Sequence, residues 1–202
     1  MRDGSGTVLN SRADEERQRS LYRRLAASKL PVNLYSARAH MQRTAAALLH
    51  GMRKASGSWE ELDGRQLADD VRGDRTALLL AGATGGVAHT SAGTRGLLAA
   101  AGAGTLFLTH IEKLSPAAQR VLYSIVEAGR YTPVGDPYPR SIGCHLIVAT
   151  NQPLLTLAHN LTGAWNLADA LGRIAFSAES IIRAFEAEAF YESHPSTFAA
   201  AS

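Results

Sequence analysis

The sequence has few of the residues that would indicate a secreted, metal-binding or membrane-spanning protein. Its 202 residues include one cysteine, Cys144, so an internal disulfide or a cysteine-based metal cluster is excluded. None of its seven histidines has the spacing of a metal-ligand motif, so we expect no metal site. No apolar run approaches the length of a membrane span, and the N-terminus is charged where a signal peptide would be apolar. We therefore expect a soluble, cytoplasmic protein in which Cys144 is a buried thiol.

Strong charge of one sign is also missing. The net charge of +3 is too small to argue for nucleic-acid binding, and 46% hydrophobic with 19% charged residues is an ordinary globular balance. Acidic residues at positions 14–16 interrupt an arginine-rich segment near the start, which favours a solvated amphipathic helix there. The arginines concerned are Arg12, Arg17, Arg19, Arg23 and Arg24. The length suits one domain, which we place at residues 13–192, between a flexible N-terminus (1–12) and a flexible tail (193–202).

The hydrophobic pattern predicts strands that alternate with helices. Apolar runs predict strands near Val32–Tyr35, Trp59–Leu62, Thr105–Leu108, Leu146–Thr150 and Ile174–Phe176. Helices are expected over about 13–28, around 41–52, from Ser115 to Gly129, up to about 171, and over 178–190, with a hairpin between Arg130 and Ile142. The Gly- and Ala-rich segment 73–104 fits neither pattern, and local propensity leaves it undecided between helix and strand.

This alternation predicts a three-layer α/β fold around a parallel sheet. Ligands of such sheets bind at the carboxyl ends of the strands. The loops after Tyr35, Leu108 and Thr150 are therefore the expected place for chemistry.

Three segments of the chain carry a specific resemblance. Gly104–Leu114 reads GTLFLTHIEKL, Glu127–Gly135 reads EAGRYTPVG, and Leu146–Asn151 reads LIVATN. In order and spacing they resemble the AAA+ domain of the sigma-54-dependent transcription activators, whose pattern is G-T-L-F-L-D-E-I, then E-G-x-x-x-x-V-G, then A-T-N. The resemblance implies a P-loop NTPase-like fold. It also implies that the family's helical lid and DNA-binding helix-turn-helix have no counterpart in this sequence.

The segment that corresponds to the family's phosphate-binding loop has lost the residues that grip phosphate. The family pattern G-E-S-G-T-G-K-E falls on Ser36–Arg43, which reads SARAHMQR. No glycine remains to let the backbone approach phosphate, and Gln42 stands at the lysine position. Ser36, Arg38, Gln42 and Arg43 are therefore a degenerate cofactor-binding set, in which either arginine could serve as a substitute phosphate contact. The alternative is an ordinary turn between a strand and a helix.

The carboxylates that would hold Mg²⁺ and activate water are also replaced. By resemblance they fall on Thr109 and His110. Threonine is a poor magnesium ligand, and a histidine without a metal partner is better explained as a polar cap on a strand end. The Glu112 side chain would have to point in a different direction to substitute for either of these carboxylates. The family's asparagine on the second strand, which restrains its catalytic glutamate, falls on Gln66.

Other positions of the family pattern survive in part. Thr150 and Asn151 match the first sensor, and Arg173 matches one of two arginines that reach the nucleotide of a neighbouring subunit; the alternative for Arg173 is a surface arginine. The second arginine falls on Leu167. The loop that contacts sigma-54, G-A-F-T-G-A, falls on 85–90, where its aromatic residue and threonine become Val87 and Ala88.

Three functions remain open on this basis. The first is a non-hydrolysing AAA+ regulator that acts through protein contacts, with an intact AAA+ activator or sigma-54 RNA polymerase as partner and with no cofactor. The second is an ATP-binding regulator, or an ATPase, that uses substitute residues with ATP and Mg²⁺. The third is an inactive relic of the domain.

Overall fold

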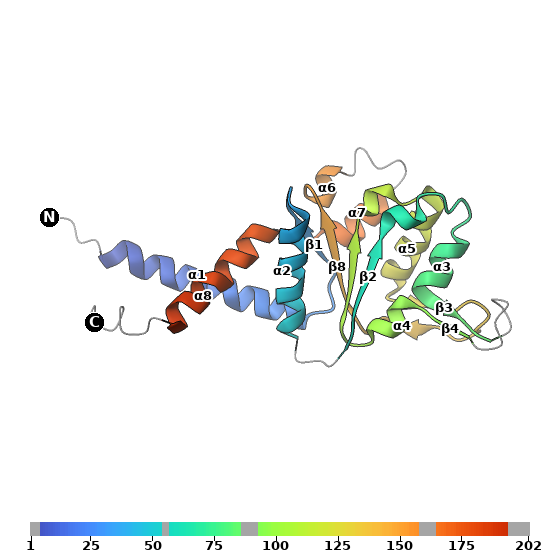
Figure 1. Ribbon diagram of the computed structural model, residues 1–202, viewed down its shortest axis with the longest axis horizontal. Helices are drawn as coiled ribbons and strands as arrows, with labels where there is room; N and C mark the ends of the chain where they lie inside the picture. The colour runs from blue at the N-terminus through green and yellow to red at the C-terminus, as the bar shows by residue number, and fades with distance from the viewer. Residues whose placement is uncertain (1–4, 54–56, 86–92, 158–164, 194–202) are drawn as a thin grey trace.

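A central parallel sheet organises the molecule (Figure 1). The computed structural model describes residues 5–53, 57–85, 93–157 and 165–193. In spatial order the sheet contains β2 (Trp59–Asp63), β5 (Thr105–Thr109), β8 (His145–Thr150), β1 (Val32–Tyr35) and β9 (Ala175–Ser177), and all neighbouring pairs are parallel. Each of these strands lies within a residue or so of its predicted position, so the predicted parallel sheet is confirmed.

Helices cover both faces of the sheet, which gives the predicted three layers. One face packs against α1 (Ser5–Ala27), α2 (Ala39–Gly51) and α8 (Ala178–Ser193), and the other against α3 (Asp74–Ala81), α4 (Leu97–Ala101), α5 (Pro116–Ala128) and α7 (Trp165–Gly172). Alternate residues of β5 enter the two cores: Leu106 and Leu108 face α5, whereas Phe107 faces α2. Burial on both faces explains why β5 and β8 are nearly continuous apolar runs.

Local signals determine the helix between β5 and β8. The Ser115 hydroxyl accepts a hydrogen bond from the Ala118 amide at 3.0 Å, and Pro116 takes the first helical position. Gly129 ends α5 with φ of 61°, a left-handed conformation that suits glycine. The predicted hairpin follows as β6 (Arg130–Tyr131) paired with β7 (Arg140–Ser141).

The undecided segment 73–104 contains both kinds of structure. Its apolar run lies in α3, and α4 follows the short antiparallel pair β3 (Gly82–Ala83) and β4 (Thr94–Arg95). Short helical turns η1 (Gly64–Leu67), η2 (Ile111–Lys113) and α6 (Leu154–Leu157) follow β2, β5 and β8. Main-chain hydrogen bonds from Thr84 to Val134 and from Val134 to Gly82 join the two hairpins.

The N-terminal helix is longer than the sequence predicted. We expected this helix to begin near Ala13, whereas α1 begins at Ser5. Extending an existing helix costs far less than nucleating one, so a segment of low propensity can continue a helix anchored further along by Tyr22 and Leu25. Towards the C-terminus, α8 reaches Ser193, three residues past the predicted end.

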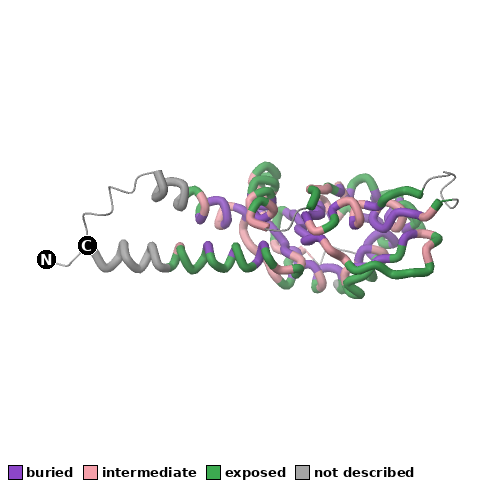
Figure 2. Tube along the Cα trace, turned by 90° about the horizontal axis from the view of Figure 1, so that it is seen from below, coloured by how far each residue is buried: buried purple, intermediate pink, exposed green. Residues whose placement is uncertain are grey.

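The helices α1 and α8 pack against each other and run together away from the sheet (Figures 1 and 2). Burial is concentrated where they meet the sheet body (Figure 2). Within the described residues, none of the helices is long and apolar enough to cross a membrane.

Candidate functional site

A cleft of about 430 Å³ lies at the carboxyl edge of the sheet. The loops after β1, β5 and β8 all contribute to it, as expected for a parallel sheet. Its lining includes most of the residues that the sequence singled out: Ser36, Gln42, Arg43, Thr109, His110, Glu112, Thr150 and Asn151. The fold therefore brings these residues, from three separate loops, to one cleft.

Ser36 ties the start of the loop to the C-terminal helix. Its hydroxyl accepts a hydrogen bond from the Arg38 amide at 3.0 Å and donates one to the Glu179 carboxylate. Glu179 also accepts from Ser177 at 2.8 Å. The hydrogen bond from Ser36 is the main reason that the pKa of Glu179 is lowered from its ordinary value. One amide at the start of α2 is thus satisfied inside the protein, and Glu179, some 143 residues away, was not anticipated from the sequence.

Gln42, at the lysine position of the family pattern, points its amide at the protein's own backbone. Its Nε2 donates to the carbonyl of Ser36 at 2.7 Å and to that of Thr150 at 2.8 Å. Both amide hydrogens are used, and they join the loop after β1 to the end of β8. A neutral group bound in this way offers neither the charge nor a free donor that an outer phosphate requires.

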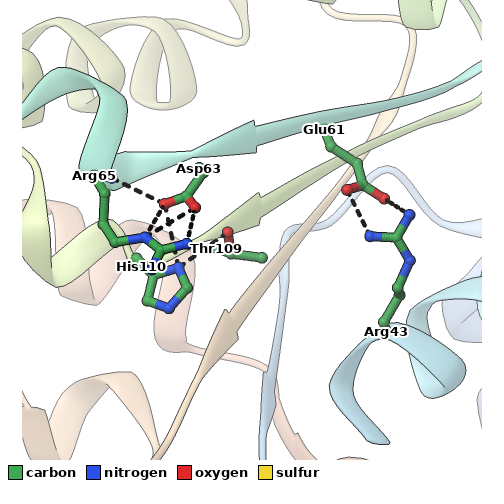
Figure 3. Close-up of polar contacts among 6 residues, drawn as sticks. All are labelled: Arg43, Glu61, Asp63, Arg65, Thr109 and His110. Atoms are coloured by element: carbon green, nitrogen blue, oxygen red, sulfur yellow. Dashed lines mark hydrogen bonds and ion pairs between the residues drawn. The ribbon is translucent and has the colours of Figure 1, made fainter. Parts of the chain in front are cut away.

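The residues at the magnesium and water positions lie at the end of β5. Thr109 pairs in register with Asp63 at the end of β2, and His110 follows in the left-handed region at φ of 49°. The His110 Nδ1 lies 3.2 Å from an Asp63 oxygen (Figure 3). Hydrogen bonds from Arg65 lower the pKa of Asp63, so this carboxylate stays ionised. The polar cap predicted for His110 is consistent with this geometry.

The expected role of Gln66 is a correction. We expected it on the second strand, but it lies in η1, beyond the end of β2. Asp63 is the residue that meets the end of β5. Gly64 permits the approach, because a Cβ there would lie 2.3 Å from the His110 carbonyl oxygen. A gapless register could not show that the chain turns at Gly64.

The two arginines considered as substitute phosphate contacts differ in position. Arg43 lines the cleft, but its two terminal nitrogens each lie 2.7 Å from an oxygen of Glu61 on β2 (Figure 3). Arg38 is exposed, precedes α2, and is not among the residues that line the cleft. A phosphate at Arg43 would compete with Glu61 for the guanidinium.

The two sensor-like residues, Thr150 and Asn151, differ in their surroundings. Thr150 is buried, and its hydroxyl accepts from Asn33 Nδ2 at 2.8 Å and donates to the Gln152 carbonyl. Asn33 also accepts from the Leu154 amide at 2.8 Å. Only Asn151 is exposed to the cleft. Our sequence analysis missed Asn33, although a polar residue inside the apolar run Val32–Tyr35 was a usable signal.

Of the two positions that correspond to the family arginines, Leu167 lies on α7 and Arg173 directly follows that helix, and neither lines the cleft. Arg173 is exposed and pairs with Asp169 one turn earlier. This position agrees both with an arginine that reaches the nucleotide of a neighbouring subunit and with an ordinary surface arginine. Leu167 is buried in the core and cannot reach a neighbouring subunit. Most of the loop expected to contact sigma-54 (85–90) lies outside the described residues.

The chemistry available at the cleft is limited. Among the described residues, no group of three or more histidine, cysteine or acidic side chains could hold a metal ion. Glu112, which lies in η2, is the carboxylate among the lining residues. Gln42, Thr150 and Ser36 are engaged internally, so the groups left to meet a ligand include Glu112 and Arg43.

Comparison with known proteins agrees with this geometry. Residues 65–164 match the family model described as the Sigma-54 interaction domain. This stretch belongs to the Sigma-54 interaction domain family. It contains β5, α5, the β6–β7 hairpin and β8, the segments on which the resemblance was first recognised.

Two curated relatives share part of that stretch. The transcriptional regulatory protein DagR of Salmonella typhimurium (strain 14028s / SGSC 2262) is 42% identical over 60 residues, and the phenol regulator MopR of Acinetobacter guillouiae is 39% identical over 51 residues. These matches cover 29% and 25% of this chain. They span 6% of DagR and 9% of MopR, so the aligned stretch is a small part of the length of each relative.

Solved structures show the same fold over most of the chain. NtrX from Brucella abortus matches with a TM-score of 0.62 at 16% identity, covering 86% of this chain and 41% of NtrX. The P-loop NTPase domain of an Escherichia coli sigma-54 activator matches with a TM-score of 0.50 at 18% identity, covering 80% of this chain and 92% of that domain. The molecule is thus a P-loop NTPase-like AAA+ fold.

Proposed function

We propose that this chain is a regulatory AAA+ domain of sigma-54-type transcription control that does not hydrolyse ATP and acts through protein contacts. The observation that carries the proposal is the position of Gln42. Its amide closes the phosphate loop onto Thr150, where the family has a lysine for the outer phosphates. Thr109 and His110 replace the two carboxylates that hydrolysis requires. The partner would be an intact AAA+ activator or the sigma-54 RNA polymerase.

The retained cleft supports a second candidate, an ATP-binding regulator that uses substitute residues. Its volume and its position at the carboxyl edge of the sheet are those of a ligand site, and Arg43 lines it. The Glu61 contact and the occupied Gln42 amide weigh against this candidate.

A thermal titration with ATP and Mg²⁺ separates the two candidates. Ligand at about a hundred times its dissociation constant stabilises a protein by about 2.7 kcal/mol, which would raise the melting temperature by several degrees. We expect no shift for the natural chain and no release of phosphate. A saturable shift, or phosphate release abolished by Arg43→Ala, would instead establish the second candidate.

A rescue variant tests whether only the chemistry is missing. Restoring the family residues should create ATP binding, because glycine permits close backbone approach and lysine supplies the charge. Hydrolysis should remain absent, since Leu167 is buried where the family has an arginine. The substitutions are Ser36→Gly, Arg38→Ser, Ala39→Gly, Met41→Gly, Gln42→Lys, Thr109→Asp and His110→Glu.

The matched control keeps Gln42 and carries the other six changes. It should fold like the rescue variant but bind ATP far more weakly by calorimetry. A folded rescue variant without binding would show that the cleft no longer accepts a nucleotide in any form.

A further inference from the structure

Two nitrogen-bearing side chains at the cleft face carboxylates on β2. Arg43 contacts Glu61, and His110 contacts Asp63 (Figure 3). Arg65 places a guanidinium on the same Asp63 carboxylate. Neither carboxylate is among the residues that line the cleft. The edge strand therefore supplies negative charge to the cleft from just outside it.

The register of β2 fixes this arrangement. Trp59 packs against the core on the α2 side, whereas Leu62 belongs to the opposite core. Because side chains alternate along a strand, Glu61 and Asp63 share the Trp59 face and point towards α2 and the end of β5. Glu60, between Trp59 and Glu61 in sequence, lies on the other face.

We propose that Glu61 and Asp63 form an electrostatic gate that keeps polyphosphate out of a latent anion site in the cleft. The inference rests on the proposed function, because it explains how a retained cleft excludes nucleotide. A polyphosphate that took Arg43 from Glu61 would leave the Glu61 carboxylate without its guanidinium, next to Asp63, which Arg65 still pairs. The Arg43 and Glu61 side chains are 63% and 34% exposed, so the pair itself is weak and exchangeable. Repulsion between the β2 carboxylates and the polyphosphate, more than the strength of the Arg43–Glu61 pair, excludes the anion from the site.

Calorimetric titration with inorganic tripolyphosphate at low ionic strength tests the gate. The variant Glu61→Gln/Asp63→Asn should bind at least about tenfold more tightly than the natural chain, and the gain should shrink in about 1 M salt, where charges are screened within about 3 Å. The matched control is Asp69→Asn/Asp136→Asn. It makes the same change in net charge and breaks two arginine–carboxylate pairs away from the cleft.

The outcomes separate the gate from net charge and from the proposed function. Adding Arg43→Ala to the gate variant should remove the gain. A folded gate variant without a gain, or an equal gain in the control, would overturn the proposal. If the double substitution unfolds the protein, Glu61→Gln alone must still give a gain, and its failure counts equally against the gate. Binding of ATP and Mg²⁺ by the natural chain contradicts the proposed function separately.

Discussion

Asn33 shows at the scale of one residue how the fold positions its cleft. It is fully buried in β1, yet its side chain reaches the carbonyl of Val148, the hydroxyl of Thr150 and the amide of Leu154. One amide therefore fixes both the end of β8 and the chain that leaves it. A buried polar group of this kind is stabilising only while all its partners are present.

Replacing Asn33 should consequently be costly. Asn33→Leu keeps the volume but leaves the Leu154 amide without its acceptor, so we expect a loss of about 2–3 kcal/mol in the free energy of unfolding. Asn151→Leu, at an exposed position of the same cleft, is the control and should change stability by less than about 0.5 kcal/mol. Urea denaturation measures both, and equal losses would contradict the role assigned to Asn33.

Buried His145 should make the protein sensitive to mild acid. Desolvation, aided by the nearby charge of Arg53, lowers the pKa of His145 from 6.5 to about 4. Its Nε2 lies 3.0 Å from the Leu30 carbonyl, while Nδ1 has no hydrogen-bond partner. The folded protein therefore holds the neutral ring, and the unfolded chain takes up the proton first as the pH falls.

This contribution to stability is complete above pH 6.5, decreases as the pH falls, and is exhausted near pH 4. The loss should amount to about 3 kcal/mol. His145→Gln can still donate to Leu30 but does not titrate, so its stability should be flatter over this pH window. Denaturant midpoints measured from pH 7 to pH 4 test this; parallel curves for the two proteins would contradict it.

At the scale of elements, α5 is the helix that the sequence predicts best. Its serine cap, first-turn proline, apolar face and terminal glycine are all local signals, and all are found in place. The cap also has a tertiary role that the sequence does not reveal. Ser115 donates to the carbonyl of Asp70 at 2.6 Å, and Asp70 in turn accepts from Gly73 and Thr76 at the start of α3.

Ser115→Ala should therefore cost more than a typical lost cap. We expect about 2 kcal/mol, because the Ala118 amide loses its acceptor and the buried Asp70 carbonyl loses its donor. Ser124→Ala, the same change at an exposed position of the same helix, should be nearly neutral. The measurement is thermal unfolding of both variants. Similar effects would show that the cap contributes little.

At the scale of the whole molecule, Arg53 joins the N-terminal helix to the sheet. Its guanidinium donates to the carbonyl of Ala26 in the last turn of α1, to that of Ser28 just after the helix, and to that of Ala103 before β5. Burial lowers its pKa, though at this high value the group stays charged. One side chain thus joins the segment after α2 to two segments that are remote in sequence.

Arg53→Met keeps much of the apolar stem and removes these hydrogen bonds. We expect a loss of about 2–3 kcal/mol, together with faster hydrogen exchange in the second half of α1, because the helix loses its attachment to the body. Arg72→Met, which removes an exposed pair with Asp74, is the control and should leave both measurements nearly unchanged. Unaltered exchange in α1 would show that Tyr22 and Leu25 hold the helix without Arg53.

The sequence by itself determined the parallel sheet, the helix and hairpin between β5 and β8, and the loss of the family's lysine and carboxylates. Those features depend on apolar periodicity, caps and residue identity, which are local. The sequence alone did not determine the structure of segment 73–104, because its small residues are compatible with both helix and strand. Tertiary packing stabilises the helices α3 and α4 there.

Tertiary structure alone decided what the substituted residues contact. Gln42 meets Thr150 across 108 residues, Ser36 meets Glu179 across 143, and the turn at Gly64 brings Asp63 rather than Gln66 to the end of β5. The physical reason is that parallel strands gather their carboxyl ends at one edge whatever their order in the chain. Side chains from distant parts of the sequence therefore meet at this edge. Only the tertiary structure shows that a cleft lies there and that the Ser36 hydroxyl and the Gln42 amide beside it are hydrogen-bonded within the protein.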